Sequence, residues 1–361
     1  MPIREKSFRI GCGRYLQEAG LLDRVGAEVL RLGKAPLIVG GPTALSLTKE
    51  KIEKSVSAVC VQYKFVEHPG TCNDERAMEL ADLAKKEGYD VIVGVGGGVM
   101  MDFSKLCGYY AKLPVINVPT SSATCACYTP LSVRYTPEGR TVGSRHYEYE
   151  VDAVLADTEI IAKQPVRLLL AGVFDALAKF VEIKQRFNET TTEFPIGLDW
   201  AYIMSKHSYQ ILNTKTMDCI ADMEKGTLSD TVEQLIFAAL AGTGVISGIA
   251  RGSNQTALAH KFYESTRTLF HETARPYLHG EIVGVGLLLQ NHFNGEEENN
   301  TALRELMKGY GMPSSIAEIG VTADDETKEK YYDLLSVCSA VETEEERVRL
   351  RAGLDYLWGL K

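Results

Sequence analysis

The chain has 361 residues, of which 45% are hydrophobic and 24% are charged, and its formal net charge is −9. This composition is typical of a globular protein and argues against disordered, coiled-coil and collagen-like chains. The acidic balance and the lack of a Lys/Arg-rich run argue against a nucleic acid or a membrane surface as partner. We therefore expect the protein to act on a small molecule.

The N-terminal residues and the cysteines indicate the compartment. Residues 1–20 contain scattered charges and no signal-peptide core, and we find no run of about 18 apolar residues, so we expect a cytoplasmic protein. Eight cysteines in a chain of this length are not a disulfide framework. Cys125 and Cys127 have no second pair to complete a zinc cage, so we expect reduced thiols.

The first 160 residues alternate between short apolar segments and helical patterns, as in a parallel sheet covered by helices. The expected strands are residues 35–41, 57–66, 90–98, 113–120 and 152–157, and a helix is expected over 72–90. Residues 131–140 form a further strand that enters a Pro-Glu-Gly turn, so we expect a hairpin at the edge of this sheet.

After Pro165 the sequence has a 3.6-residue periodicity and almost no strand pattern. A chain of this length typically forms two domains. We therefore expect an α/β, Rossmann-like domain over residues 1–162, followed by an all-helical domain over residues 163–361, with a cleft between them.

A glycine-rich turn, GVGGGVMMDFSK (94–105), follows a buried strand and opens a helix. It lacks the G-x-G-x-x-G pattern of dinucleotide-binding turns. Glycines at the carboxyl end of a strand let a phosphate approach free backbone N–H groups at a helix start. The same glycines also suit a tight turn, so both interpretations stay open. We expect Asp102 in the first turn of the helix, where an acid favours the helix dipole.

A second loop, PTSSATCACYTP (119–130), leaves the next strand at its carboxyl end and is rich in small hydroxyl residues. Open α/β sheets bind their ligands at this end of the strands. The hydroxyls suit a pyrophosphate or a carboxamide, although Ser and Thr are also common in loops that bind nothing.

Three residues of the helical half are candidate metal ligands. Asp175 lies in an apolar helical segment, where a carboxylate is costly to bury without a cation. His260 and His279 would complete a three-ligand set with an open position, as in catalytic metal sites. Their spacing does not enforce such a site, and a helical histidine is often only a structural hydrogen-bonding group.

Six motifs follow one another in the order found in glycerol dehydrogenases. They are GGG-x-x-x-D-x-x-K (96–105), PTSSAT (119–124), LADTEII (155–161), G-x-x-D-A-L-A (172–178), ALAH (257–260) and LHGE (278–281). Over nearly its full length the chain resembles the glycerol dehydrogenase branch of the iron-containing alcohol dehydrogenase superfamily. This resemblance implies the fold shared with dehydroquinate synthase, with the active site between an NAD(P)-binding domain and a helical metal domain.

The resemblance also implies the residues of the site. The expected metal ligands, which are also the catalytic residues, are Asp175, His260 and His279. The expected cofactor-binding residues are Gly40, Gly41, Gly96, Gly97, Gly98, Asp102, Thr120, Ser121, Ser122, Thr124 and Leu131. A divalent ion on a substrate hydroxyl lowers its pKa, so that a hydride can pass to nicotinamide C4. Zinc is the first choice, and two histidines with one carboxylate also suit ferrous iron.

The chain departs from the family in ways that bear on substrate and cofactor. Lys179 stands where iron-dependent members have a further histidine ligand, which favours the three-ligand zinc type. A cation on the face of Asp175 would attract a carboxylate, so a 2-hydroxy or 2-oxo acid is the alternative substrate to an alcohol or polyol. Cys125 stands where glycerol dehydrogenases have an acid near the substrate. Gly40 and Gly41 supply no acid for the ribose, so NADP is an alternative to NAD.

Three further expectations remain. His271 is the rival of either ligand histidine and a candidate proton relay, and together with Cys125 and Lys179 it is a candidate substrate-contacting residue. A dehydroquinate synthase-like lyase and a non-catalytic sensor are the competing functions. The helical half of this chain shows no Lys/Arg-rich motif for the phosphorylated substrate of such a lyase, which argues against the first of them. Family likeness suggests a homo-oligomer.

Overall fold

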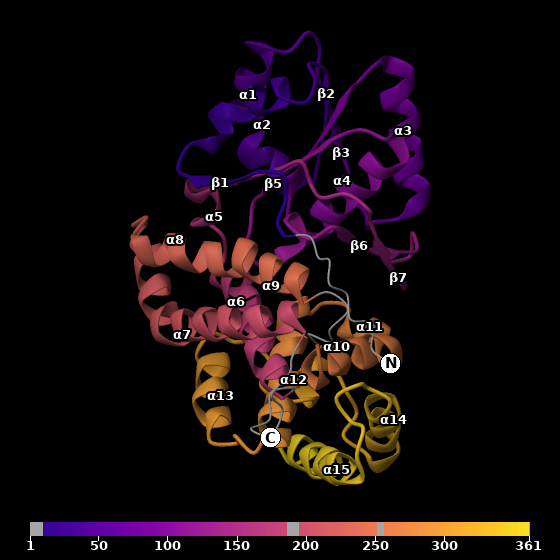
Figure 1. The fold of residues 1–361 in the computed structure, drawn as a ribbon, viewed down its shortest axis with the longest axis vertical. Helices are drawn as coiled ribbons and strands as arrows, with labels where there is room; N and C mark the ends of the chain where they lie inside the picture. Colours follow the sequence, from indigo (N-terminus) through magenta and orange to yellow (C-terminus); the bar gives the residue numbers. More distant parts are fainter. Residues whose placement is uncertain (1–9, 186–194, 251–255, 361) are drawn as a thin grey trace. The chain divides into compact units, whose positions relative to one another are not determined.

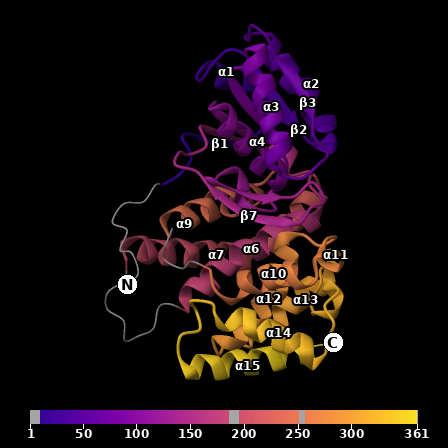
Figure 2. The ribbon, with the colours of Figure 1, turned by 90° about the vertical axis from the view of Figure 1, so that its right-hand side faces the viewer.

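The structure is a computed structural model that describes residues 10–185, 195–250 and 256–360. The described residues form two compact units (Figures 1 and 2). The sheet unit comprises Ile10–Gln164 and Lys215–Val245, and the helical unit comprises Pro165–Thr214 and Ile246–Lys361.

A six-stranded parallel sheet is the centre of the sheet unit. In spatial order its strands are β1 (Tyr15–Glu18), β8 (Ala153–Asp157), β5 (Val115–Pro119), β4 (Val91–Gly96), β2 (Pro36–Gly40) and β3 (Lys64–Glu67). Strands β2, β4, β5 and β8 are buried along their whole length, which explains their continuous apolar sequences. These four strands confirm the prediction of a parallel sheet.

Helices cover both faces of this sheet. The 3-10 turn η1 and helices α1 and α2 pack on one face, and α3 and α4 pack on the other (Figure 1). Their bounds are η1 (Leu21–Arg24), α1 (Val25–Leu30), α2 (Pro42–Ser57), α3 (Asp74–Glu87) and α4 (Gly98–Ala111). Local sequence sets the limits of α3: the Asn73 side chain accepts the Arg76 N–H at 2.9 Å, and Gly88 ends the helix at a φ of 77°.

Two predictions for this unit are wrong in detail. The predicted hairpin exists as β6 (Leu131–Tyr135) and β7 (Thr141–His146), but it is a separate two-stranded sheet. The edge strands of the sheet are instead β3 and β1, and β1 is a four-residue strand whose sequence gives little strand signal. The predicted strand over 57–66 is also too long, because α2 continues to Ser57 and β3 begins at Lys64.

A helical segment from later in the chain packs on this unit. It contains the end of α7 (Ile196–Glu224), α8 (Asp230–Phe237), the π-helical turn η3 (Ala238–Gly242) and the start of α9 (Thr243–Ile249). The Gln17 side chain donates to the Glu233 carbonyl at 2.9 Å. Among the described residues, the run Asp230–Ile249 alone is long and apolar enough to span a membrane, and 67% of it is buried inside the protein, as in a core helix.

The helical unit contains no strand among its described residues, which confirms the predicted all-helical second half. Its helices are α6 (Val166–Lys184), most of α7, the end of α9, α10 (Leu258–Leu269), α11 (His271–Ala274), α12 (His279–Phe293), α13 (Asn299–Gly309), η4 (Ala317–Ile319), α14 (Asp325–Ser336) and α15 (Glu344–Gly359). Helix α5 (Thr158–Ile161) precedes them in the sheet unit.

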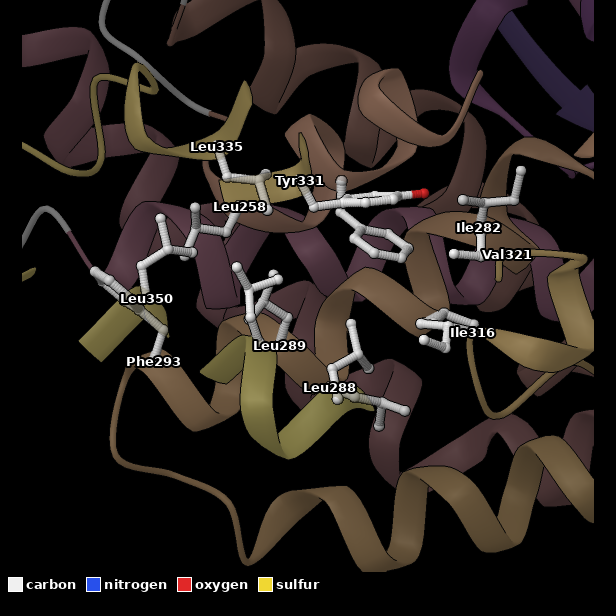
Figure 3. Close-up of a cluster of buried hydrophobic side chains, with 14 of the residues drawn as sticks. Leu258, Ile282, Leu288, Leu289, Phe293, Ile316, Val321, Tyr331, Leu335 and Leu350 are labelled. Carbon is white, nitrogen blue, oxygen red and sulfur yellow. The ribbon is translucent and has the colours of Figure 1, made fainter. Parts of the chain in front are cut away.

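Helix α12 is the central helix of this unit and packs against α6, α10 and α15 (Figure 2). Leu288, Leu289 and Phe293 of α12 lie in one apolar cluster with Leu258 of α10 and Tyr331 of α14 (Figure 3). The cluster fixes the separation of these helices, because close-packed side chains leave little room for sliding.

Glycines let α12 approach its neighbours more closely than usual. A Cβ added to Gly280 would lie 1.8 Å from the carbonyl oxygen of Ala171 in α6. One added to Gly286 would lie 2.6 Å from the carbonyl oxygen of Ala259 in α10. The neighbouring atoms belong to backbone, so they cannot turn away as a side chain would.

We expect Gly280→Ala to lower the free energy of unfolding by about 3 kcal/mol, because the methyl group must push α12 away from α6. Urea unfolding of metal-free protein, followed by the helical circular dichroism signal, measures this. Gly309→Ala at the end of α13 is the matched control, because nothing lies within 4 Å of its added Cβ. Equal stability of the two variants would contradict the predicted clash.

Candidate metal centre and cofactor loop

Asp175, His260 and His279 come together in the helical unit. Each offers one ligand atom, and these atoms lie within 4.8 Å of one another. His260 Nε2 is 3.1 Å and His279 Nε2 is 3.5 Å from Asp175 Oδ1. Asp175 and His260 are buried and His279 is partly exposed, so the cluster is reached from the side of His279.

Three packed helices supply these residues. Asp175 is in the middle of α6, His260 is the third residue of α10, and His279 is the first residue of α12. The close approach at Gly280 brings the beginning of α12 onto α6, and this places His279 beside Asp175.

The geometry fits a divalent metal ion. Ligands about 2.0–2.2 Å from a tetrahedral ion are roughly 3.3–3.6 Å apart. The two distances to Asp175 Oδ1, 3.1 and 3.5 Å, are close to this range. Two imidazoles and one carboxylate also suit zinc and ferrous iron, and a set of three leaves a position open for substrate.

The neighbours of Asp175 favour the ionised form of its carboxyl group. Burial opposes the ionisation of Asp175, but the Lys179 ammonium and the two hydrogen-bonded imidazoles hold its pKa well below the usual value. Burial lowers the pKa of His279 below its usual value despite the nearby Asp175, so its imidazole is neutral and able to bind a metal.

The three residues predicted to contact substrate lie in different places. Lys179 is buried, and its Nζ is 3.9 Å from Asp175 Oδ1 and 3.2 Å from His260 Nε2. Cys125 is half-buried in the 3-10 turn η2 (Cys125–Cys127) of the sheet unit. His271 opens α11 and lies outside the ligand cluster that the described residues form.

Two further carboxylates hold the ligand histidines, and the sequence analysis did not identify them. Glu281 accepts from Arg167 Nε at 2.6 Å, from Arg167 Nη2 at 2.7 Å and from the Leu278 N–H at 2.7 Å. It thereby fixes the start of α12, where His279 stands. Glu182 contacts His260 directly. Its spacing of seven residues from Asp175, which is two helical turns, was a signal available in the sequence.

The glycine turns lie at the switch point of the sheet. The chain passes from β2 outward to β3 and then returns to β4 on the other side of β2. Open α/β sheets bind ligands at the carboxyl ends of strands at this point. Gly40 ends β2 with Gly41 following it, and Gly96 ends β4 with a φ of 155° that other residues rarely adopt.

The glycine turn and the hydroxyl-rich loop lie side by side. A Cβ added to Gly98 would lie 2.6 Å from Thr124 Oγ1, and one added to Gly97 would lie 3.4 Å from Ser121 Oγ. The Thr120 N–H donates to the Gly96 carbonyl at 2.9 Å. These residues therefore present glycine backbone and hydroxyl groups together, which suits a diphosphate.

Ser122 has a structural role at the same time. Its N–H donates to Gln164 Oε1 at 2.8 Å, and its Oγ accepts from Gln164 Nε2 at 2.7 Å. Ser122 is fully buried, so these contacts anchor the hydroxyl-rich loop to the chain after β8. A contact between Ser122 and a cofactor stays a prediction.

The prediction that Asp102 lies in the first turn of the helix is wrong. Helix α4 begins at Gly98, so Asp102 is beyond the first turn and does not compensate the dipole at the helix start. Its Oδ1 is 2.9 Å from Lys105 Nζ, and its Oδ2 accepts the Val133 N–H at 3.0 Å. Asp102 is buried, and its direct contact with a cofactor stays a prediction.

Lys105 joins α4 to the loop that ends at β6. Its buried ammonium donates to the carbonyls of Ala126 at 2.6 Å and Thr129 at 2.9 Å, and also to that of Leu131. An ammonium has three protons, and the three carbonyls accept them while Asp102 balances the charge. The contact with Lys105 thus fixes the backbone of Leu131. Binding of a cofactor by Leu131 stays a prediction.

We expect Lys105→Met to destabilise the protein by about 3–5 kcal/mol, because the Asp102 carboxylate would stay buried without its cation. Urea unfolding followed by circular dichroism measures the change. Lys86→Met, at an exposed position of α3, serves as control and should change stability by less than about 0.5 kcal/mol. A Lys105 variant as stable as this control would show that the buried pair is dispensable.

Comparison with known proteins identifies the family. The family model for iron-containing alcohol dehydrogenases matches residues 12–158. A glycerol dehydrogenase of Thermotoga maritima is 31% identical over 86% of this chain and 84% of its own. Hydroxycarboxylate dehydrogenase A of Escherichia coli is 29% identical over 73% of this chain and 72% of its own. The crystal structure of glycerol dehydrogenase from Schizosaccharomyces pombe has the same fold, with a TM-score of 0.81 at 23% identity over 98% of this chain and 92% of that one. The chain therefore belongs to the iron-containing alcohol dehydrogenase family, in its glycerol dehydrogenase-like branch.

Proposed function

We propose that the protein is a metal-dependent, NAD(P)-linked alcohol or polyol dehydrogenase of the glycerol dehydrogenase type. The observation that carries this proposal is the meeting of Asp175, His260 and His279, whose ligand atoms lie within 4.8 Å of one another. Relatives named glycerol dehydrogenase, at about 30% identity over most of the chain, support the same activity.

Under this proposal Asp175, His260 and His279 hold the metal ion and leave one position for the substrate oxygen. A bound ion would lower the pKa of a substrate hydroxyl, and the hydride would pass between the substrate carbon and nicotinamide C4. Zinc is our first choice and ferrous iron the alternative. Lys179, at the place where a fourth protein ligand would stand, cannot bind a cation, so the set stays at three.

The cofactor is NAD or NADP. The adjoining glycine turn and hydroxyl-rich loop support binding of its diphosphate, because both lie at the carboxyl ends of strands near the switch point. Gly40 and Gly41 offer no carboxylate to repel a 2′-phosphate, and nothing lies within 4 Å of a Cβ added to Gly41. The open space at Gly41 supports acceptance of NADP as well as NAD, whereas Gly40 is packed against Leu45 and pairs with Glu67 of β3.

A 2-hydroxycarboxylate dehydrogenase is the second candidate. It is favoured by Lys179, whose buried ammonium lies 3.9 Å from Asp175 Oδ1 and so next to the proposed metal position. A substrate carboxylate beside the reacting hydroxyl would find a cation there. The similarity to a hydroxycarboxylate dehydrogenase adds support.

The remaining expectations are part of the proposal. We assign the dinucleotide-binding role to residues 1–162 and the metal-binding role to residues 163–361. We also propose a homo-oligomer in the cytoplasm. Cys125 and His271 remain candidate residues for contact with the substrate.

A substrate panel tests the proposed activity. Metal-loaded protein, incubated with diols, polyols and 2-hydroxy acids and with NAD or NADP, should accumulate the reduced cofactor, measured by its absorbance at 340 nm. A dehydroquinate synthase-like lyase returns its cofactor unchanged and would give no net signal. Glycerol oxidation without any 2-oxoacid reduction would exclude the role of Lys179 in binding a carboxylate.

We expect Asp175→Asn to weaken metal binding more than about a hundredfold, beyond the tenfold to hundredfold loss typical of residues outside the ligand set. An amide keeps the shape of Asp175 but loses the charge that binds a cation. Competition with a chromogenic chelator measures the affinity, and NADH production measures the activity. Asp199→Asn, at an exposed position of α7, is the control. Unchanged zinc affinity and activity in Asp175→Asn would refute the metal site.

A further inference from the structure

Glu182 is a buried carboxylate that the proposed ligand set does not contain. It lies on α6 two turns after Asp175, and its side chain is 0% exposed. A carboxylate in such surroundings is costly unless each of its oxygens accepts hydrogen bonds. The groups that donate to the two oxygens of Glu182 therefore explain how its charge is stabilised in the protein interior.

Glu182 makes two kinds of contact with the beginning of α10. Its Oε1 accepts the backbone N–H groups of Ala257 at 2.8 Å and His260 at 2.9 Å. These are N–H groups at a helix start, which have no partner within the helix. Its Oε2 is 2.5 Å from Nδ1 of the His260 ring. One side chain thus holds both the backbone and the imidazole of a ligand residue.

The second contact determines which ring nitrogen of His260 carries the proton. A carboxylate oxygen only accepts, so Nδ1 must donate to Glu182, and Nε2 keeps its lone pair in the neutral ring. The ammonium of Lys179 lies 3.2 Å from Nε2 and only donates, which requires the same lone pair.

Nε2 also faces the Asp175 carboxylate, whose oxygen lies 3.1 Å away. Without a metal ion, a proton on Nε2 or the nearby Lys179 ammonium satisfies this pair of atoms. A divalent ion bound by both atoms takes that place, and Nε2 binds it through the lone pair that the Glu182 contact leaves on this nitrogen.

We infer that Glu182 is a positioning residue that accepts the Nδ1 proton of His260 and directs its Nε2 lone pair at the metal position. The inference rests on the proposed metal site and assigns a role to a residue outside it. Outer residues of this kind typically contribute tenfold to hundredfold in metal affinity.

A purely structural role must be distinguished from this one, and Gln290 of α12 provides the comparison. Its Oε1 accepts the Leu258 N–H at 2.7 Å, so it also holds the start of α10. Gln290 is fully buried, like Glu182. Its amide nitrogen donates to Gln185 Oε1 at 2.8 Å and to Asn294 Oδ1 at 3.0 Å, both of which are amide side chains.

The test compares zinc affinity of Glu182→Gln and Gln290→Leu, in full-length protein stripped of metal and titrated with Zn²⁺ against a chelator. Glu182→Gln keeps an oxygen for the two N–H groups, but its amide donates to Nδ1 and so moves the ring proton to Nε2. We expect its dissociation constant to rise about tenfold to hundredfold. Gln290→Leu should lower the unfolding temperature of the metal-free protein and leave the zinc affinity within about twofold of the wild type.

Equal zinc affinity of Glu182→Gln and the wild type would overturn the inference, as would an equal loss in both variants. Asp175→Asn separates the two proposals: if its zinc affinity also stays unchanged, the metal site itself is wrong. If it loses zinc and Glu182→Gln does not, only the role of Glu182 fails.

A measurement on the wild type avoids any effect of substitution on folding. Nitrogen-15 NMR of the seven histidine side chains distinguishes protonated from metal-bound ring nitrogens. With zinc bound, the His260 signals, assigned by their loss in His260→Asn, should show a proton on Nδ1 and metal on Nε2. Metal on Nδ1 would contradict the inference.

Discussion

The cost of burying the Asp175 carboxylate governs the helical unit. An isolated charge at this depth in α6 would be strongly destabilising, so cationic or hydrogen-bonding groups must surround it. The structure supplies them through His260 of α10, His279 of α12 and Lys179 one turn along α6 itself. For these groups to reach one carboxylate, α12 must approach α6 to a distance that requires a glycine at position 280. The apolar cluster of α10, α12 and α14 holds these three helices together.

Both ligand histidines stand at helix starts, and a buried carboxylate holds each start. Glu182 accepts the N–H groups of Ala257 and His260 at the start of α10, and Glu281 accepts the N–H of Leu278 before α12. Helix starts leave N–H groups without partners, so a carboxylate there is well placed energetically. The same charge also orients the ligand, directly at His260 and through the helix start at His279. Stability and metal binding are thus connected through the same hydrogen bonds.

Much of the fold was predictable because it depends on local periodicity. The buried strands β2, β4, β5 and β8 and the helical second half follow directly from apolar patterns. The errors occur where pairing decides the outcome. Strand β1 is four residues long and is a strand because β8 binds it, and the hairpin of β6 and β7 pairs only with itself. Asp102 was misplaced because the helix starts at Gly98, and its partner Lys105 was not recognised.

The sequence by itself determined the class of fold, the family and the residue types of the site. Asp175, His260 and His279 stand out because ionisable groups in apolar helical segments are costly to bury without a partner. The glycines of 96–98 stand out because they follow a buried strand. Only the tertiary structure decided which groups meet. It brought His260 and His279 to one oxygen of Asp175, buried Lys179 beside them and placed Glu182 against Nδ1 of His260. These contacts join residues up to about a hundred positions apart, and such distances are set by helix packing, which no local pattern contains.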